Sequence, residues 1–127
     1  MLALYANNSK VEQEIEAIPM NISVERFDQI FMNSTEKTLP GLKAKYAFLF
    51  PKQTPDSIFL NRTKDPIQKL IQRAVDSVFD DFSTTEEALI SFYKHIKYYK
   101  PSLKTPRLIS VYSDVDYRNK VIVTDSI

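Results

Sequence analysis

The stretch DPIQKLIQRAVDSV, residues 65–78, constrains the fold more than any other part of this 127-residue sequence. Asp65 can cap a helix by accepting hydrogen bonds from its first backbone N–H groups, and Pro66 suits the first helical position. Gln68 stands where the partner of a capping box would be. Apolar residues then recur at helical intervals and form one stripe: Ile67, Leu70, Ile71, Ala74, Val75 and Val78. We therefore predict an amphipathic helix that ends at the FDDF segment.

Two more helices are predicted before this one. Ser9 and Glu12 have capping-box spacing, so a helix is expected to begin at Ser9 and to end at Pro19. A second helix is expected over about residues 38–48, with a buried face made of Leu39, Leu42, Tyr46 and Leu49. Gly41, the only glycine in the chain, weakens that helix. The segment FPKQTPDS that follows carries two prolines and is predicted to be a loop.

The last long helix is predicted to begin with a capping box formed by Ser83 and Glu86, and Pro101 stops it. Helical spacing favours one inward-facing set of side chains: Leu89, Phe92, Tyr93, Ile96 and Tyr99. This helix would therefore contribute an aromatic face to the core.

Three short segments have the pattern of strands. The segment NISVERFD alternates apolar and polar residues, before Phe27, Ile30 and Phe31 return to a helical spacing. Near the end, RLISVY and KVIV read as two strands joined by SDVDYRN, which predicts an antiparallel hairpin with a long turn. The predicted class is α+β, with several amphipathic helices packed on a small sheet that includes this C-terminal hairpin.

The end of the chain predicts an incomplete domain. Val121, Ile122 and Val123 are apolar on both faces of a strand, and such strands normally lie inside a sheet. We expect residues 1–10 to be a tail or the remnant of a tether, and residues 11–127 to be a single α+β domain from the N-terminal part of a longer protein. An exposed apolar edge at 121–123 would cause the chains to self-associate. Alternatively, the strand pairs with RLISVY, and Ile127 packs against the domain.

Composition excludes several functions. A net charge of +1 provides no overall attraction to nucleic acid, and the absence of Cys excludes disulfides and thiolate metal sites. The single glycine argues against nucleotide-binding loops, which need close backbone approach to phosphate.

Two sets of residues are candidates for a metal or catalytic site. Asp114, Asp116 and Asn119 resemble a calcium loop but lack its glycine and its final Glu, so a polar turn is the better interpretation. His95, the only histidine, has no catalytic or zinc partner at a motif spacing and is expected to bond helix carbonyls. We therefore predict no catalytic, cofactor-binding or metal-binding residue and no cofactor.

A basic run could bind single-stranded nucleic acid, because aromatic residues are interleaved with it. Its members are Lys94, Lys97, Lys100, Lys104 and Arg107. The preceding stretch is equally acidic, with Asp76, Asp80, Asp81, Glu86 and Glu87, so we favour charge pairing on the surface over nucleic-acid binding.

Four stretches taken in order resemble one family. They are IEAIPMNISVERFDQIF, YAFLFPKQTPDSIF, FYKHIKYYKPSLKTP and SDVDYRNKVIVTDSI. Together they are similar to the gliding-motility lipoprotein GldB of Bacteroidetes-type bacteria, over about residues 11–127. The resemblance implies a non-enzymatic cell-envelope protein, membrane-anchored by a lipid on an N-terminal Cys, that supports gliding and its associated secretion machinery. Its partners would be other envelope or gliding-machinery proteins, with no nucleic acid and no small-molecule substrate.

The sequence departs from that family in two respects. The lipid-bearing Cys is absent, and MLALYANNSK stands where a signal peptide and lipobox would lie. Family members also continue past TDSI, which agrees with the expectation of a longer protein. The alternative function is the N-terminal part of a zinc-metallopeptidase-like protein whose metal site lies beyond this chain.

Overall fold

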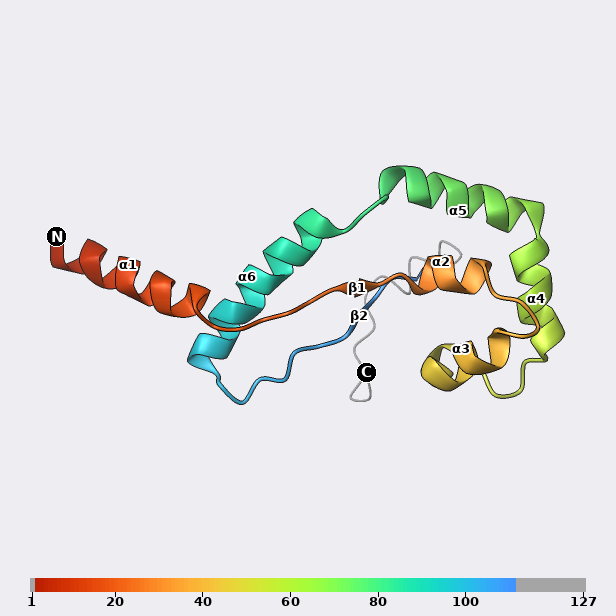
Figure 1. Ribbon diagram of the computed structural model, residues 1–127, viewed down its shortest axis with the longest axis horizontal. Helices are drawn as coiled ribbons and strands as arrows, with labels where there is room; N and C mark the ends of the chain where they lie inside the picture. The colour runs from red at the N-terminus through yellow and green to blue at the C-terminus, as the bar shows by residue number, and fades with distance from the viewer. Residues whose placement is uncertain (1, 112–127) are drawn as a thin grey trace. The chain divides into compact units, whose positions relative to one another are not determined.

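The computed structural model describes residues 2–111, with side chains from residue 9 onward. Two compact units are formed from these residues, one from 2–25 with 82–108 and the other from 26–81 with 109–111. Figure 1 labels the elements, which are α1 (Leu2–Glu16), β1 (Val24–Glu25), α2 (Phe27–Met32), α3 (Leu39–Lys45), the 3₁₀ turn η1 (Ala47–Leu49), α4 (Asp56–Lys64), α5 (Pro66–Val78), α6 (Ser83–Tyr99) and β2 (Leu108–Ile109).

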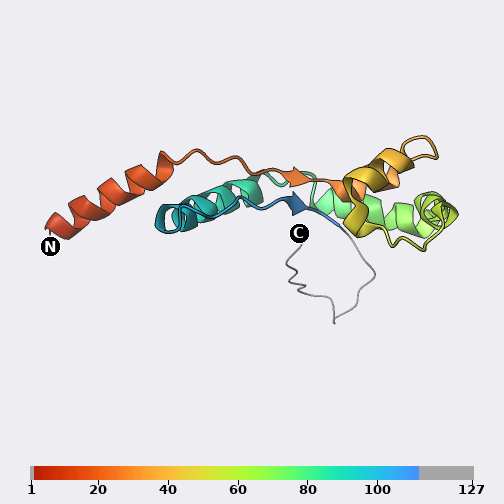
Figure 2. The same cartoon turned by 90° about the horizontal axis from the view of Figure 1, so that it is seen from below.

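The α+β class is confirmed. The sheet has two strands, β1 and β2, which are hydrogen-bonded neighbours. Their arrows point the same way in Figure 2, so the pair is parallel. β1 lies within the predicted NISVERFD strand, and β2 lies within RLISVY. Within residues 2–111, therefore, the first strand of the predicted hairpin pairs with an early segment of the chain. The predicted second strand, 120–123, lies outside the described residues.

An aromatic core holds the second unit together. Its buried members are Phe31, Leu39, Leu42, Tyr46 and Phe50. The predicted buried face of α3 is therefore correct at Leu39, Leu42 and Tyr46, while Leu49 packs against the core from the side. Tyr46 is fully buried. The helix itself is shorter than predicted, because it ends at Lys45 and a 3₁₀ turn follows. This turn keeps Leu49 and Phe50 close to the core.

The start of α5 confirms the prediction from DPIQKLIQRAVDSV. The Asp65 carboxylate accepts from the backbone N–H of Ile67 at 2.7 Å and from that of Gln68 at 3.4 Å, and Pro66 is the first helical residue. The reciprocal half of the capping box is absent among these contacts, because the Asp65 N–H bonds the Arg62 carbonyl and the Gln68 side chain accepts from Arg62 Nε. The preceding helix α4 explains this difference, since it ends directly at the cap.

Two predicted capping boxes are wrong. α1 begins at Leu2, so Ser9 lies inside it rather than at its start. α6 does begin at Ser83, but Phe82 is its N-cap residue, and a phenylalanine side chain makes no capping hydrogen bond. Glu86 instead accepts from the Val24 backbone N–H at 2.6 Å, so its carboxylate is used by the strand. A partner distant in sequence, Val24, therefore takes the place of the predicted local partner, Ser83.

Two further expectations were also wrong in part. The predicted loop FPKQTPDS ends two residues early, because α4 begins at Asp56 after Pro55, and this helix was not predicted. In α6, Phe92 and Tyr99 do not face inward, since they are 55% and 74% exposed. The reason is that α6 contacts α1 through its polar residues Lys94, His95 and Tyr98, and Lys94 and Tyr98 lie on a different face of the helix from Phe92.

Candidate functional site

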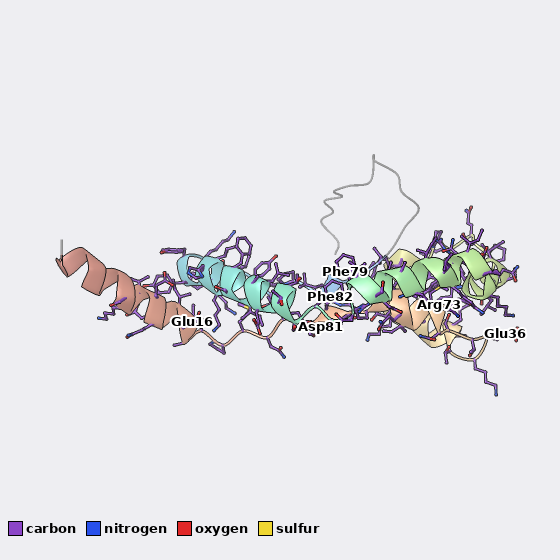
Figure 3. All side chains as sticks on the ribbon, turned by 90° about the horizontal axis from the view of Figure 1, so that it is seen from above. Glu16, Glu36, Arg73, Phe79, Asp81 and Phe82 are labelled. Atoms are coloured by element: carbon purple, nitrogen blue, oxygen red, sulfur yellow. The ribbon has the colours of Figure 1, made fainter. Side chains whose placement is uncertain are left out.

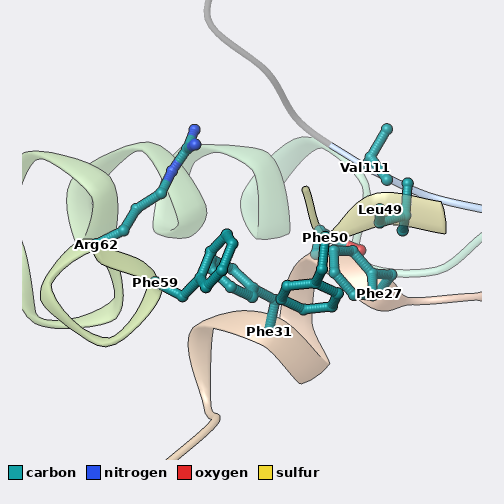
Figure 4. Close-up of a pocket in the computed structure, with 8 residues that line it drawn as sticks. Phe27, Phe31, Leu49, Phe50, Phe59, Arg62 and Val111 are labelled. Atoms are coloured by element: carbon teal, nitrogen blue, oxygen red, sulfur yellow. The ribbon is translucent and has the colours of Figure 1, made fainter. Parts of the chain in front are cut away.

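A cavity of about 260 Å³ in the second unit is the first candidate site. Figure 4 shows its lining, which comes from α2, from η1 and the residue after it, from α4, and from the segment after β2: Phe27, Asp28, Phe31, Leu49, Phe50, Phe59, Arg62 and Val111. Six of these eight residues are apolar, so the cavity favours an apolar group.

Aromatic rings form the wall of this cavity by packing edge to face. Phe59 from α4 meets Phe50 at a centroid distance of 4.9 Å and Phe31 at 6.5 Å, both in T-shaped geometry. Phe27 contacts Phe50 in the same way at 5.8 Å. Such pairs add to the hydrophobic stabilisation, and they hold the rings in defined orientations. The wall is therefore also part of the core.

The buried carboxylate of Asp28 lies at this cavity and is 2% exposed. Arg26 binds it with two nitrogens, Nη2 to Oδ2 at 2.9 Å and Nε to Oδ1 at 3.1 Å. Ser110 Oγ donates to Oδ1 at 2.5 Å, and Gln72 Nε2 donates to Oδ2 at 3.1 Å. Burial alone would raise the pKa of Asp28, but the hydrogen bonds from Arg26, Ser110 and Gln72 outweigh it and lower the pKa to about 2.

The network continues from Asp28 to α5. Asp76 Oδ1 accepts from Arg26, from Gln29 and from Gln72, at 3.2, 2.9 and 2.9 Å. Arg26 also donates to the Phe79 carbonyl at 2.9 Å, and its pKa is raised, chiefly by the hydrogen bond to Asp28. Together these bonds join α2, α5 and the segment after β2, because the Asp28 N–H also bonds the Ser110 carbonyl.

This arrangement suits a structural role for Asp28 rather than a proton-transfer role. Its two oxygens already accept four bonds, and the low pKa keeps it ionised at neutral pH. A general base needs a pKa nearer to the working pH. The sequence analysis did not identify this network. Arg26 and Asp28 are two residues apart in a strand-to-helix turn, and that spacing has no motif that would have revealed it.

His95 lies in the first unit. Its Nδ1 is 2.7 Å from the Ser91 carbonyl and its Nε2 is 3.2 Å from a Glu12 carboxylate oxygen. Both partners are acceptors, so the protonated ring satisfies both. The pKa of His95 is raised, first by the bond to the Ser91 carbonyl and then by Glu12. The bond to the helix carbonyl agrees with the expectation from the sequence, while the Glu12 contact was not foreseen.

Part of the basic run pairs with acids, but not with the acidic stretch that we expected. Lys94 Nζ bonds Glu16, at 2.8 Å to its backbone carbonyl and at 3.1 Å to its carboxylate. Arg107 forms a two-nitrogen pair with Glu25 at 2.8 and 2.9 Å. Tyr98 donates to Glu14 at 2.9 Å, and this bond raises the pKa of Tyr98. The partners therefore come from α1 and β1, which precede the run by about 80 residues.

The remaining candidates add no metal centre to the described part of the chain. Asp114, Asp116 and Asn119 lie outside the described residues. Among residues 2–111, no three His, Cys, Asp or Glu side chains gather closely enough to bind a metal ion. Over the same residues, no helix is both long enough and apolar enough to cross a membrane.

The comparisons with known proteins give one positive result. The sequence model described as "Gliding motility protein GldB" matches residues 8–127, which is nearly the whole chain. The comparison with curated proteins gave no match, and the comparison with solved structures gave none. The match includes α6, both strands and the whole Asp28 network. The chain therefore belongs to the GldB family of gliding motility proteins.

Proposed function

We propose that this protein acts in bacterial gliding as a non-enzymatic interaction component at the cell envelope, where it supports the gliding machinery and its associated secretion system. The family match over residues 8–127 is the observation that supports this proposal. In the full-length form, the protein is anchored to the membrane by an N-terminal lipid, and its partners are other envelope or gliding-machinery proteins.

The chemistry of the candidate sites supports a binding role over catalysis. Asp28 is ionised and hydrogen-bonded on both oxygens, and His95 contacts a carbonyl and a carboxylate rather than a nucleophile. Exposed apolar side chains are instead numerous on the second unit: Ile30, Phe48, Ile58, Ile67, Leu70, Ile71, Val78 and Phe79. Exposed apolar surface of this extent is typical of proteins that bind other proteins.

The test is genetic. The gene is deleted in a gliding bacterium, and spreading of the colony is measured with and without the wild-type gene restored. We expect the deletion to abolish spreading and the wild-type gene to restore it. Normal spreading of the deletion strain would contradict a role in gliding.

A second set of strains tests the absence of catalysis. His95→Gln and Glu12→Gln replace titratable groups that do not hold the core, so both variants should fold and restore spreading. A variant with the wild-type protein level and stability that fails to restore spreading would contradict the non-enzymatic role. Asp28→Asn serves as the folding control, because its loss of spreading should accompany loss of protein.

A further inference from the structure

The apolar stripe of α5 is exposed. We define the α5 stripe as Ile67, Leu70, Ile71, Ala74, Val75 and Val78. Four of its side chains are open to solvent, with exposed fractions of 67% for Ile67, 65% for Leu70, 37% for Ile71 and 70% for Val78. A helix with one apolar stripe normally buries that stripe against its own domain. Here the described residues leave it largely uncovered.

The opposite side of α5 holds the helix in place. Gln72 is 7% exposed, and its side chain donates to Asp28 and Asp76. Residues 72 and 76 are four apart and share one side of the helix, about half a turn away from the line through Ile67, Ala74 and Val78. The polar side of α5 therefore faces α2, and the apolar side faces outward. Figure 3 shows α5 with its side chains and labels Arg73 on it.

We propose that the α5 stripe binds the α5 stripe of a second copy of this chain, with the two helices antiparallel. A two-fold axis between Gln72 and Arg73 sets Ile67 level with Val78 and Ile71 level with Ala74 along the middle of the contact, and it sets Leu70 level with Val75 at the two edges of the stripe. Each pair sets a larger side chain against a smaller one, which is how apolar layers interdigitate without voids. The same patch meets itself, as a two-fold interface requires.

The charges agree with this occupant. Gln68 and Ser77 flank the stripe on its two sides, and both are uncharged. The charged residues of α5, Lys69, Arg73 and Asp76, lie on its other side. Two antiparallel copies therefore place no charged side chain within the apolar contact, and their helix dipoles are opposed. A lipid surface fits less well, because helices that lie in a membrane surface usually carry several Lys or Arg beside the apolar face.

The size of the stripe predicts a weak dimer. α5 has 13 residues, and a helix of this length extends about 20 Å. Its stripe covers much less than the roughly 800 Å² per partner that stable complexes bury. We therefore expect a dimer that dissociates on dilution, so the measurement must extend to high protein concentration.

Sedimentation of the purified chain is the first test. Wild-type protein should shift from monomer towards dimer as its concentration rises. Leu70→Gln should raise the dissociation constant at least tenfold, whereas Lys69→Gln, the neighbouring position on the opposite side of the helix, should leave it within a factor of two. A wild-type chain that remains monomeric, or association that Leu70→Gln leaves unchanged, would overturn the proposal. The second result would point to another surface, such as the apolar segment 121–123.

Cysteine cross-linking tests the direction of the helices, and the chain contains no native Cys to interfere. An equal mixture of Ile67→Cys and Val78→Cys chains should form disulfide-linked dimers on mild oxidation. Each variant alone should form few, because antiparallel helices separate identical positions by about 16 Å, beyond the reach of a disulfide. Dimers from each variant alone would show a parallel or non-specific contact. Cysteines at 67 and 78 that resist thiol reagents in monomeric protein would show that the chain covers its own stripe. Either result would overturn the proposal.

Discussion

The two units use the same kinds of polar contact with different consequences. In the first unit, α1 and α6 are joined by Lys94 with Glu16, His95 with Glu12, and Tyr98 with Glu14, and the carboxylates are largely exposed. In the second unit, α2 and α5 are joined through a carboxylate that is 2% exposed. Water competes for exposed charges and screens them, whereas a buried charge depends entirely on its protein partners. The same residue types should therefore contribute very different free energies of unfolding.

The largest effect should come from Asp28→Asn. Removing the negative charge leaves Arg26 with less compensation and disturbs the bonds from Ser110 and Gln72. We expect the free energy of unfolding of the second unit to fall by about 3 kcal/mol. Chemical denaturation measures the change, and amide hydrogen exchange of α2 and α5 locates it.

The matched control for this variant is Asp56→Asn. Asp56 also forms an ion pair, with Lys43 at 2.6 Å, but its side chain is 53% exposed. We expect a loss below about 1 kcal/mol. Equal losses for the two variants would mean that burial does not separate the two kinds of contact.

Acid should produce the next largest effect. The pKa of Asp28 is about 2 in the folded protein, against an ordinary value of 3.8. Because the folded pKa is lowered, the stabilisation is nearly complete at about pH 5 and is lost as the pH falls from about 5 to about 1. The expected contribution is about 2 kcal/mol. The free energy of unfolding, measured by chemical denaturation across this pH range, should depend less on pH in Asp28→Asn than in the wild-type protein. An equal pH dependence in the two proteins would refute the assignment.

The N-cap of α5 should contribute less. In Asp65→Ala, the backbone N–H groups of Ile67 and Gln68 lose their acceptor. We expect a loss of about 1 kcal/mol. Ser77→Ala is the control near the other end of the same helix, since its hydroxyl only bonds the Ala74 carbonyl, and it should be close to neutral. Thermal unfolding measures the loss of stability in both variants. An equal loss in Ser77→Ala and Asp65→Ala would contradict the role of the cap.

A surface pair between α1 and α6 should contribute less again. Lys94→Gln removes the contact with Glu16, whose side chain is 66% exposed, so we expect a loss of about 0.5 kcal/mol. The loss should shrink with added salt. Lys97→Gln, on the same helix, is the reference variant. A salt-independent loss well above this value would place Lys94 in the same category as Asp28.

The pH dependence of His95 should be the smallest effect. Its pKa is raised by the Ser91 carbonyl and by Glu12. A raised pKa stabilises the fold below the ordinary value of the histidine pKa and loses that contribution as the pH rises through the folded value. Titration of the ring by NMR should show the raised pKa. In Glu12→Gln it should move back towards the ordinary value, and an unchanged pKa would exclude Glu12 as a cause.

Local sequence was sufficient for several features that depend on residues close along the chain. The Asp65 cap, Pro66 at the first helical position, and the buried Leu39, Leu42 and Tyr46 were all predicted, because caps and helical periodicity depend on residues a few positions apart. Tertiary structure decided the rest. Glu86 accepts from the backbone N–H of Val24 instead of forming the predicted capping box. The network around Asp28 depends on donors distant in sequence, Gln72 and Ser110.

The α5 helix shows this division most clearly. Its sequence by itself determined that it is a helix with one apolar stripe, because spacing of 3.6 residues per turn needs no other part of the protein. Periodicity does not state which face meets the domain. That was decided by Asp28, a buried carboxylate that needs donors and obtains one from Gln72 on the polar side. Leaving a buried charge without partners costs more than leaving a few aliphatic side chains in water, and so α5 turns its stripe outward.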